Sequence, residues 1–482
     1  MSAAQAAPRP LNATTYDAGE RPRVRIVHLG LGAFHRAHQA WYTERAGDGW
    51  GIAAFTGRSP EAARQLSGQD GLYTLVERAA DGDRHEVIAA EVEAHDGADL
   101  GRLATLLAHP DIAIVTLTVT EAGYRLAPGA AGEGPRLDTD DGFVAADISA
   151  LHAHYEGSNF ILGIGGLDGR LVRTTAGRLL VGLAARRAAD GWPIAVVSCD
   201  NLPGNGAAAR ASVLGLAEQI DPLLAAWIGE NVSFVNSSID RITPRTTEAD
   251  RASVAEATGY DDVASVVTEP FSSWVLAGDF PAGRPAWEAA GALFVEDLEP
   301  YERRKLWLLN GAHSLMAYVG SLRGHDTVSE ALADGRILGW VEEFWDAAAR
   351  HLQDEQLDIP RYRAALRERF ANPRIAHHLA QIGQDGSLKL AARALPVYRA
   401  ERGAGREGTA ALRLLAAWID RIDAQLAAGE DVLDPAARRI AAAASGFGTA
   451  QTQALLAVVD STLAAEDEAV SAVHALRGTF TD

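Results

Sequence analysis

Residues 301–314, YERRKLWLLNGAHS, combine side chains that can move and hold a proton. A lysine removed from water can lose its proton near neutral pH and act as a base, whereas arginine stays protonated. The chain holds 44 lysines and arginines, and only Lys305 and Lys389 among them are lysines. Lys305 is therefore either a chance lysine or an amine that the chemistry of this stretch requires.

The spacing of the polar residues around Lys305 places them on one broad side of a helix. At about 100° per residue, Asn310 lies about 140° and His313 about 80° around the helix from Lys305. Glu302 comes roughly one turn earlier, so this face offers a base, an amide, an imidazole and a carboxylate. A solvated face is the alternative. The apolar run LWLL at residues 306–309 instead predicts a largely buried helix, in which polar groups need partners or a task.

A glycine turn near the N-terminus is the second candidate for chemistry. Residues 24–29, VRIVHL, predict a strand, the tripeptide GLG at residues 30–32 follows it, and residues 33–46 predict a helix. A dinucleotide pyrophosphate needs this combination of a tight turn and a helix N-terminus. Because His35 replaces the third glycine of the usual pattern, a turn without a ligand is the alternative.

The basic residues at the start of this predicted helix leave two interpretations open. His35, Arg36 and His38 either donate to phosphate oxygens or form a solvated face. We do not expect a metal site here, because no carboxylate or cysteine stands near them in the sequence at ligand spacing.

Two later loops also follow predicted strands. After residues 52–56, a dinucleotide fold usually carries Asp or Glu for the ribose 2′-OH, but this chain has Arg58 and Ser59. They either accept a 2′-phosphate, which would favour NADP, or Arg58 stacks on adenine or faces solvent. After residues 194–198, Asn201 either donates to an oxygen that gains negative charge or forms a turn.

The order of predicted elements indicates how these residues are positioned. Short apolar strands at 24–29, 52–56, 112–119, 194–198 and 232–235, separated by helices, predict a parallel sheet covered on both faces. Beyond residues 281–285 the spacing becomes helical, at 299–319, 326–352, 360–370, 406–428 and 447–465. We therefore predict an α/β fold: a Rossmann-type, mostly parallel-sheet domain at 1–283 and an all-α domain at 284–482, with the site in a cleft between them.

Composition narrows the function classes. Of 482 residues, 48% are hydrophobic and 22% charged, as in soluble enzymes, and the net charge of −20 argues against nucleic-acid and anionic-membrane partners. The single cysteine, Cys199, excludes an intrachain disulfide and a multi-cysteine zinc site. Without an evident signal or membrane-spanning segment we expect a cytoplasmic protein, a monomer or small homo-oligomer, with no metal.

Seven motifs together resemble the mannitol dehydrogenase family of long-chain, metal-independent polyol dehydrogenases, which includes mannitol 2-dehydrogenase and fructuronate reductase. The resemblance covers residues 24–400, and the spacing of Lys305, Asn310 and His313 is its most specific part. The motifs are IVHLGLGAFHRAHQAWYTE, DGLYTLVER, TLTVTEAGY, SCDNLPGNG, DRITPRTT, TEPFSSWV and YERRKLWLLNGAHS.

The resemblance implies roles for individual residues. Lys305 matches the general base that takes the C2 hydroxyl proton as hydride passes to the nicotinamide ring, and Glu302 a proton-relay carboxylate. Asn201 and Asn310 match the pair that stabilises the developing oxyanion, and His313 the residue that holds the substrate oxygen. Asp240 and Lys389 match substrate-binding positions. The positions expected to bind NAD or NADP are Gly30, Gly32, Phe34, His35, Arg58 and Thr118.

The expected reaction interconverts a mannitol- or arabinitol-like polyol and its 2-ketose. Gln381 stands where mannitol-specific members carry Arg, so fructuronate reduction is the alternative, for which a carboxylate-binding Arg or Lys near Lys389 would be diagnostic. Mannitol-1-phosphate oxidation is disfavoured because the sequence shows no phosphate-binding cluster outside the cofactor turn. The joint presence of the base, both amides and the imidazole argues against a catalytically silent nucleotide- or sugar-binding protein.

Overall fold

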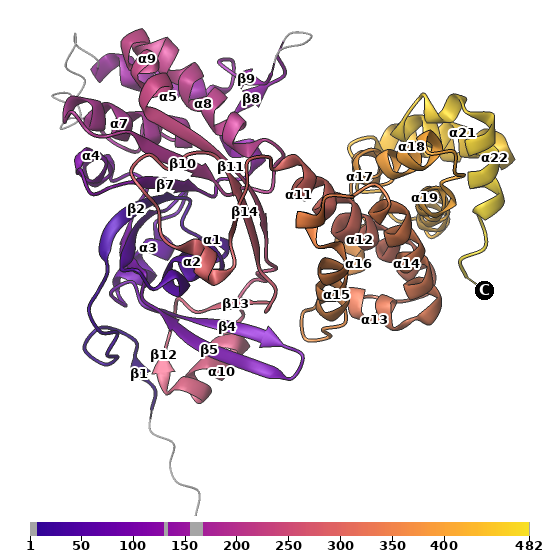
Figure 1. The fold of residues 1–482 in the computed structure, drawn as a ribbon, viewed down its shortest axis with the longest axis horizontal. Coiled ribbons are helices and arrows are strands. Elements are labelled where there is room, and N and C mark those ends of the chain that lie inside the picture. Colours follow the sequence, from indigo (N-terminus) through magenta and orange to yellow (C-terminus); the bar gives the residue numbers. More distant parts are fainter. Residues whose placement is uncertain (1–6, 130–133, 155–166, 482) are drawn as a thin grey trace, which may run out of the picture. The chain divides into compact units, whose positions relative to one another are not determined.

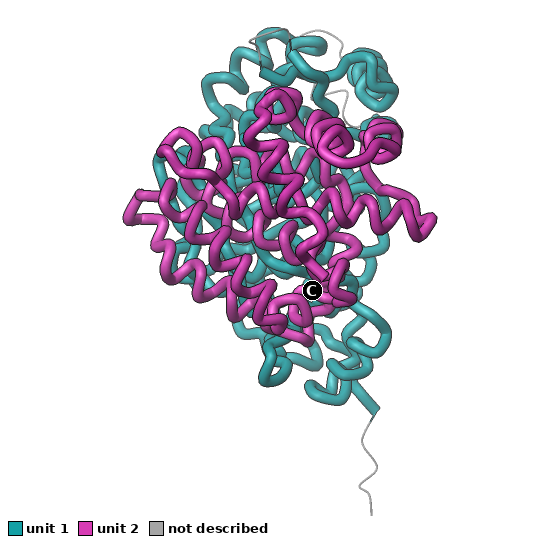
Figure 2. The backbone as a smooth tube through the Cα atoms, turned by 90° about the vertical axis from the view of Figure 1, so that its right-hand side faces the viewer, with its two compact units in different colours: residues 1–298 teal, residues 299–482 magenta. Residues whose placement is uncertain are grey.

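The computed structural model describes residues 7–129, 134–154 and 167–481. The chain divides into two compact units, residues 1–298 (unit 1) and residues 299–482 (unit 2), coloured separately in Figure 2. Figure 1 labels the helices and strands of each unit.

Unit 1 is built on an eight-stranded sheet. Six strands are parallel, and in the order β6-β3-β2-β7-β10-β11 they number 3-2-1-4-5-6 by appearance in the chain, which is the Rossmann order. The predicted fold class is confirmed. The parallel strands are β2 (Arg23–Leu29), β3 (Trp50–Phe55), β6 (Glu91–His95), β7 (Ile114–Leu117), β10 (Ile194–Ser198) and β11 (Val232–Asp240).

Successive residues of the central strands enter two different cores. Val27 and Leu29 belong to one core and Ile26 to the other, because side chains alternate between the faces of a strand. The first core packs against α4, α7, α8 and α9, and the second against α1, α2 and α3 (Figure 1). Every residue of β3, β7 and β10 is buried, because helices cover both faces of the sheet there.

Four helices of unit 1, α4, α7, α9 and α10, begin with a side-chain cap. Asp221 accepts a hydrogen bond from Leu223 N (2.8 Å) ahead of α9, and Thr247 forms a capping box with Asp250 at α10. The helices are α1 (Ala33–Ala37), α2 (Gln39–Ala46), α3 (Glu61–Ser67), α4 (Leu100–Ala108), α5 (Gly142–His154), α7 (Thr175–Ala188), α8 (Asn205–Ile220), α9 (Pro222–Asn231) and α10 (Glu248–Thr258).

Several strands of unit 1 lie outside the parallel set. β14 (Ser273–Ala277) pairs antiparallel with β11, and β15 (Leu293–Phe294) adds the last edge. A three-stranded sheet has the order β13 (Val266–Thr268), β4 (Tyr73–Ala79) and β5 (Gly82–Ile88). Two small pairs join β1 (Arg9–Pro10) to β12 (Tyr260–Asp261) and β8 (Leu126–Ala127) to β9 (Arg136–Leu137).

Unit 2 is helical and is organised around α12. Residues 312–320 of this helix are all buried, and it packs against α13, α14, α16 and α19. The helices are α11 (Glu299–Arg304), α12 (Ala312–Leu322), α13 (Val328–Ala333), α14 (Gly335–Ala349), α15 (Ile359–Phe370), α16 (Leu379–Ile382), α17 (Gly386–Arg393), α18 (Leu395–Gly403), α19 (Thr409–Ala427), α20 (Ala437–Ala444), α21 (Gly448–Val459) and α22 (Asp467–Leu476).

The division between the units falls between residues 298 and 299, beyond the 283/284 boundary expected from the sequence. The intervening segment still belongs to unit 1, because β15 (Leu293–Phe294) pairs with β14. Within the described residues, no helix combines the length and apolar character needed to cross a bilayer.

Candidate active site

The glycine turn lies where β2 and β7 separate the two halves of the parallel sheet. Gly30 has φ +115°, and a Cβ there would come within 2.0 Å of Thr118 O. Thr118 Oγ1 donates to Gly30 O (2.9 Å), and Thr118 N donates to Leu29 O (3.0 Å). Only glycine fits this close approach, and the turn occupies the switch point at which open α/β sheets bind nucleotides.

The basic residues after the turn point into the protein. His35 and His38 are fully buried and Arg36 is 8% exposed. Arg36 donates to Ala264 O, and His38 Nε2 lies 3.1 Å from Ser273 O. Burial, followed for His35 by the charge of Arg36, lowers the pKa of both histidines to about 3. Burial contradicts the solvated-face interpretation. Contact of these side chains with a phosphate at the turn stays a prediction.

A buried hydrogen-bonded chain supports the turn from beneath. The His35 ring stacks on His28 with centroids 3.4 Å apart, and His35 Nε2 lies 3.1 Å from Glu91 Oε2. His28 in turn contacts Thr116 Oγ1 (2.8 Å) through Nδ1 and Thr118 Oγ1 (3.0 Å) through Nε2. Burial raises the pKa of Glu91 to about 8, against the attraction of Arg36. The glycine motif did not predict this buried chain of side chains, because Glu91 lies on β6, 56 residues after His35.

Asn201 is exposed in the loop after β10. Its neighbour Asp200 is 7% exposed and accepts hydrogen bonds from Thr120 N (2.7 Å) and Tyr124 Oη (2.6 Å), while Asn205 Nδ2 donates to Ser237 O (2.6 Å). Asp200 and Asn205 therefore tie this loop to the strands on either side and leave Asn201 presented to solvent. Sequence reasoning selected Asn201 but missed both of these supporting residues.

The remaining predicted positions of unit 1 are partly accessible. Phe34 and Thr118 are half-buried, and the Phe34 ring stacks on His38 with centroids 5.2 Å apart. Asp240 is half-buried at the end of β11, where its backbone is in register with Ser273. Arg58 is exposed at the end of β3 and lines a cavity.

The lysine motif of unit 2 is not a continuous α-helix. Residues Lys305–Gly311 form a π-helical segment between α11 and α12, which corrects the α-helix predicted over 299–319. Hydrogen bonds from residue i to i+5 mean more residues per turn, so each residue advances by less than the α-helical angle. Asn310, five residues after Lys305, is thereby brought closer to the same face than an α-helix would place it. Such segments are frequent at functional sites.

Two residues of α14 pack against this segment. Trp345 Nε1 donates to Leu308 O (2.7 Å), and a Cβ on Gly311 would come within 2.4 Å of Phe344 Cε1. The missing side chain of Gly311 therefore admits Phe344, which the sequence could not specify. Glu302, Lys305 and Asn310 are half-buried rather than enclosed.

His313 lies on α12, one turn beyond Asn310, and is 7% exposed. Its ring lies 4.6 Å from Phe370 and 4.8 Å from His377, measured between centroids. Burial, together with His377 and Arg369, holds the pKa of His313 well below its usual value. Its Nε2 is buried and has no hydrogen-bond partner among the residues that the structure describes. A neutral imidazole with an unused nitrogen can serve a ligand oxygen.

Lys389, the second lysine, lies on α17, which packs against the π-helical segment. Its Nζ donates to Ile382 O (3.1 Å), and burial, followed by the charge of Arg393, lowers its pKa. Arg393, one turn later, donates to Asn310 O (3.3 Å) and Ser314 Oγ (2.9 Å). The structure thus brings the helix of Lys389 beside the segment that carries Asn310.

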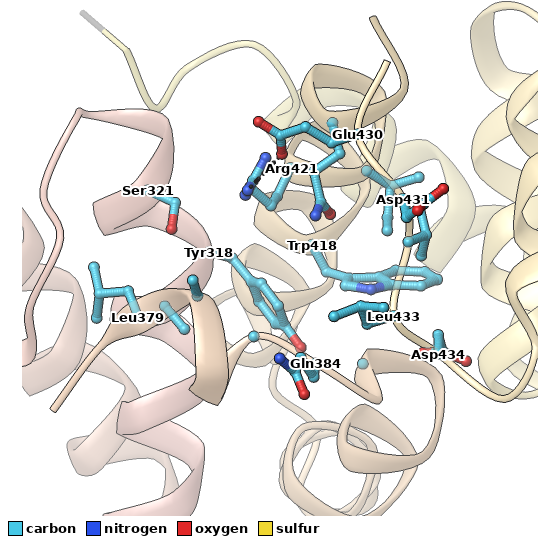
Figure 3. A pocket seen from close by; sticks show the side chains of 17 residues that line it. Tyr318, Ser321, Leu379, Gln384, Trp418, Arg421, Glu430, Asp431, Leu433 and Asp434 are labelled. Carbon is cyan, nitrogen blue, oxygen red and sulfur yellow. Dashed lines mark hydrogen bonds and ion pairs between the residues drawn. The ribbon is translucent and has the colours of Figure 1, made fainter. Parts of the chain in front are cut away.

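A small cavity of about 180 Å³ lies elsewhere in unit 2, bounded by α12, α16, α17 and α19 (Figure 3). Tyr318 projects into it from α12, with Trp418 opposite. A Cβ on Gly386 would come within 2.4 Å of Trp418 Nε1 and 2.9 Å of Tyr318 Oη. None of the predicted site residues lines this cavity, so we assign it to the packing of α17 against α12 and α19.

Metal ligands are not grouped in the part of the chain that the structure describes: no three His, Cys, Asp or Glu side chains there are arranged to hold an ion.

Comparison with known proteins decides the family. The mannitol dehydrogenase Rossmann domain matches residues 24–289, and the mannitol dehydrogenase C-terminal domain matches residues 297–477. The chain belongs to the mannitol dehydrogenase family. As a member of the mannitol dehydrogenase family it is an oxidoreductase of the polyol dehydrogenase type, acting on CH–OH groups.

Three relatives in the mannitol dehydrogenase family show its range. D-mannonate oxidoreductase of Escherichia coli (strain K12) is 37% identical over 78% of this chain and 75% of its own length. D-arabinitol 4-dehydrogenase of Ralstonia nicotianae is 36% identical over 81% of this chain and 82% of its own length. The solved mannitol 2-dehydrogenase of Pseudomonas fluorescens, a ternary complex with NAD and D-mannitol, is 32% identical over 99% of this chain and 94% of its own, with a TM-score of 0.73.

Proposed function

We propose that this protein is an NAD(P)-dependent, metal-independent dehydrogenase that interconverts a mannitol- or arabinitol-like polyol and its 2-ketose. The observation that carries the proposal is the π-helical segment that begins at Lys305, includes Asn310 and leads into buried His313. It gathers an amine, an amide and an unsatisfied imidazole on consecutive turns. Oxidation of an alcohol needs such groups. A base takes the hydroxyl proton, and hydrogen-bond donors stabilise the oxygen from which that proton departs.

The side chains have distinct tasks in this proposal. Lys305 takes the hydroxyl proton, and Glu302, one turn earlier on α11, relays it toward solvent. Asn310 and Asn201 donate to the oxygen as negative charge develops on it. His313 Nε2 holds the same oxygen, because it is buried without another partner. Asp240 and Lys389 contact the other hydroxyl groups of the substrate.

The cofactor turn fits a nicotinamide dinucleotide. Gly30 allows a close approach that a side chain would block, and the turn stands at the switch point of a sheet in the Rossmann order. Gly32, Phe34 and Thr118 remain accessible beside it. The bound nicotinamide supplies hydride transfer. His35 is left out of the contact set because it is buried beneath the turn.

Arg393 favours a second candidate, reduction of a hexuronate such as fructuronate. A carboxylate on the substrate would need a cation near Lys389, and Arg393 lies one helical turn away on the same face of α17. The D-mannonate oxidoreductase of Escherichia coli is 37% identical, at least as similar as the arabinitol enzyme. Burial is the main cause of the lowered pKa values of Lys389 and His313, and the charge of Arg393 acts in the same direction at both.

Initial rates distinguish these functions. Purified protein should be assayed with NAD and NADP on D-mannitol, D-arabinitol, sorbitol, xylitol and D-mannonate, and with the reduced cofactors on fructose and fructuronate. Turnover of a polyol supports the first function, and turnover of only the two acids supports the second. If the protein binds either cofactor but turns over none of these substrates, both proposed functions are refuted. The alternative of a catalytically silent binding protein then remains.

A further inference from the structure

Unit 1 contains a concentration of positive charge that no sequence motif reveals. A cavity of about 770 Å³ is lined by six arginines, Arg58, Arg64, Arg125, Arg170, Arg173 and Arg178. Asp96 is the only carboxylate among the described residues that line it. In a chain with a net charge of −20, such a cluster is a local feature whose own field attracts an anion.

The cavity lies at the carboxyl ends of β3 and β6. Gly57 and Arg58 follow β3, and Asp96 and Ala98 follow β6. β3 is the neighbour of β2, whose end carries the glycine turn. In a Rossmann sheet the residues after this second strand face the ribose 2′ position of the adenosine, where an acidic residue selects NAD and an arginine accommodates NADP.

Three of the guanidinium groups are available to a ligand. Arg58, Arg170 and Arg173 are exposed, and none of them forms an ion pair within the described residues. By contrast, Arg125 pairs with Asp141 (3.1 Å), and Arg64 pairs with Glu61 (3.2 Å) at the surface. Two or three unpaired arginines around one opening suit a doubly charged phosphate, which accepts several hydrogen bonds at once.

Arg178 holds the backbone next to Arg58 at the edge of the cavity. Its Nη1 donates to Gly57 O (2.8 Å) and Thr56 O (3.1 Å), and its Nε donates to Val172 O (3.2 Å). Burial lowers the Arg178 pKa, with Asp147 and Asp96 acting in the opposite direction. Arg178 thereby joins the end of β3 to the segment that carries Arg170 and Arg173, so the backbone segments of the three exposed arginines form one hydrogen-bonded frame.

The same frame lacks the group that an NAD-specific site uses. Residues 56–59, TGRS, contain no carboxylate. Asp96 is present, but its Oδ1 accepts a hydrogen bond from Ala98 N (3.0 Å), and it lines the same cavity as three unpaired arginines. A ribose hydroxyl offers these cations no charge to neutralise, whereas a 2′-phosphate does.

We propose that Arg58, Arg170 and Arg173 bind the 2′-phosphate of NADP(H), so that this enzyme selects the phosphorylated cofactor. The inference rests on the proposed function, because it names the cofactor of that reaction. The loss of one charged hydrogen bond to a phosphate lowers the affinity by about tenfold or more.

Equilibrium binding tests the selection without relying on turnover. NADPH and NADH should be titrated into wild-type protein by calorimetry, and 2′-AMP and 5′-AMP should be compared as competitors. We expect NADPH to bind at least about tenfold more tightly than NADH, and 2′-AMP to compete better than 5′-AMP. Equal or tighter binding of NADH would overturn the inference and leave the proposed function intact. Failure of both cofactors to bind folded protein would overturn both.

Variants identify the residues responsible. Arg58→Ala should weaken NADPH binding at least about tenfold and change NADH binding less than about twofold, and Arg58→Asp should reverse the preference. Arg251→Ala is the matched control, because Arg251 is exposed on α10 in the same unit but outside the cavity. If Arg58→Ala weakened both cofactors equally, Arg58 would contact another part of the dinucleotide and the inference would fall.

The phosphate could also come from a phosphorylated sugar. D-mannitol 1-phosphate and inorganic phosphate should therefore be titrated alongside the cofactors. If the sugar phosphate bound in an Arg58-dependent manner while NADPH and NADH bound equally, the cavity would serve the substrate and the cofactor assignment would be wrong.

Discussion

The glycine turn of unit 1 and the lysine motif of unit 2 are both rich in polar residues, yet the two regions use them in opposite ways. After the turn, His35, Arg36 and His38 are buried and hydrogen-bonded within the protein. In the π-helical segment, Lys305 and Asn310 stay half-exposed. The first region uses polar side chains to hold a backbone turn, whereas the second keeps two of them half-exposed.

The difference teaches that a polar residue next to a motif is not thereby part of the chemistry. A short helix that packs onto a sheet must bury one face, and in α1 the buried face includes His35 and Arg36. The widened turn of the π-helical segment instead keeps Lys305 and Asn310 near one face, while the carbonyl of Leu308 is satisfied by Trp345. Each region can be perturbed separately, and the expected effects differ in kind.

Replacement of the lysine should have the largest effect. We expect Lys305→Ala to lower kcat by about 10² to 10⁴, the range for a positioned acid or base, with little change in cofactor affinity. Lys305→Arg is the matched control: it retains the charge but cannot release a proton at accessible pH, so it should be similarly inactive. Steady-state kinetics on the best substrate measure both. Near-wild-type turnover by either variant would remove Lys305 from the role of base.

The glycine turn should respond through its backbone. Gly30→Ala would force a side chain into φ +115° and bring Cβ within 2.0 Å of Thr118 O. Strain and overpacking together predict a loss of about 3 kcal/mol in unfolding free energy, with greatly weakened cofactor binding. Gly32→Ala is the control for stability, because Gly32 has φ −153° and a Cβ there would lie 3.6 Å from Gly30 O. Equal melting temperatures for the two variants would contradict this account.

The features that could be predicted from the sequence are patterns of residues close together in the chain. The strand before Gly30, the glycine turn and the spacing of Lys305, Asn310 and His313 are all local patterns. The five predicted strands all belong to the parallel part of the large sheet, as β2, β3, β7, β10 and β11. Three strands of this sheet were missed: β14 and the two edge strands, β15 and β6. β15 is only two residues long, and the sequence of β6, EVEAH, carries charged residues rather than an apolar run.

The parts that could not be predicted depend on residues far apart in the chain. His35 is buried because Glu91, 56 residues later, completes its hydrogen bond. The π-helical segment is held by Trp345 and Phe344 of α14, and nothing within residues 301–314 distinguishes it from an α-helix. The arginine cavity gathers residues from positions 58 to 178 and is visible only once the chain is folded.

The buried pair beneath the turn should make stability depend on pH. With pKa values of about 8 for Glu91 and about 3 for His35, the folded pair holds one proton between those limits. In the unfolded chain an ordinary histidine loses its proton near pH 6.5 and an ordinary carboxyl near 4.5. The folded pair therefore retains a proton that the unfolded chain has released, and stability falls by about 2 kcal/mol between roughly pH 6.5 and 8.

Calorimetric melting temperatures of the wild type and Glu91→Gln across pH 5 to 9 measure this contribution. The glutamine cannot titrate, so the variant should lose less stability than the wild type above pH 6.5, whatever its stability at lower pH. The slopes of melting temperature against pH should be compared, rather than the melting temperatures themselves. This comparison removes the part of the stability loss that the substitution causes at every pH. Parallel slopes would show that the folded pair releases its proton over the same pH range as the unfolded chain, and the pair would then not retain a proton above pH 6.5.

The smallest expected effect tests how the π-helical segment is held. Trp345→Phe removes the hydrogen bond to Leu308 O and should cost about 1 kcal/mol in unfolding free energy, because a buried carbonyl loses its donor. Since that carbonyl lies three residues after Lys305, kcat should also fall, by a few-fold. Trp340→Phe is the matched control: Trp340 lies on the same helix, and its ring packs edge-on against Phe480. If the two variants lost stability alike but only Trp345→Phe lost kcat, the hydrogen bond would be shown to set the position of the segment rather than merely its stability. If neither lost kcat, the segment would keep its shape without Trp345, and the backbone of residues 305–311 alone would account for the placement of Lys305.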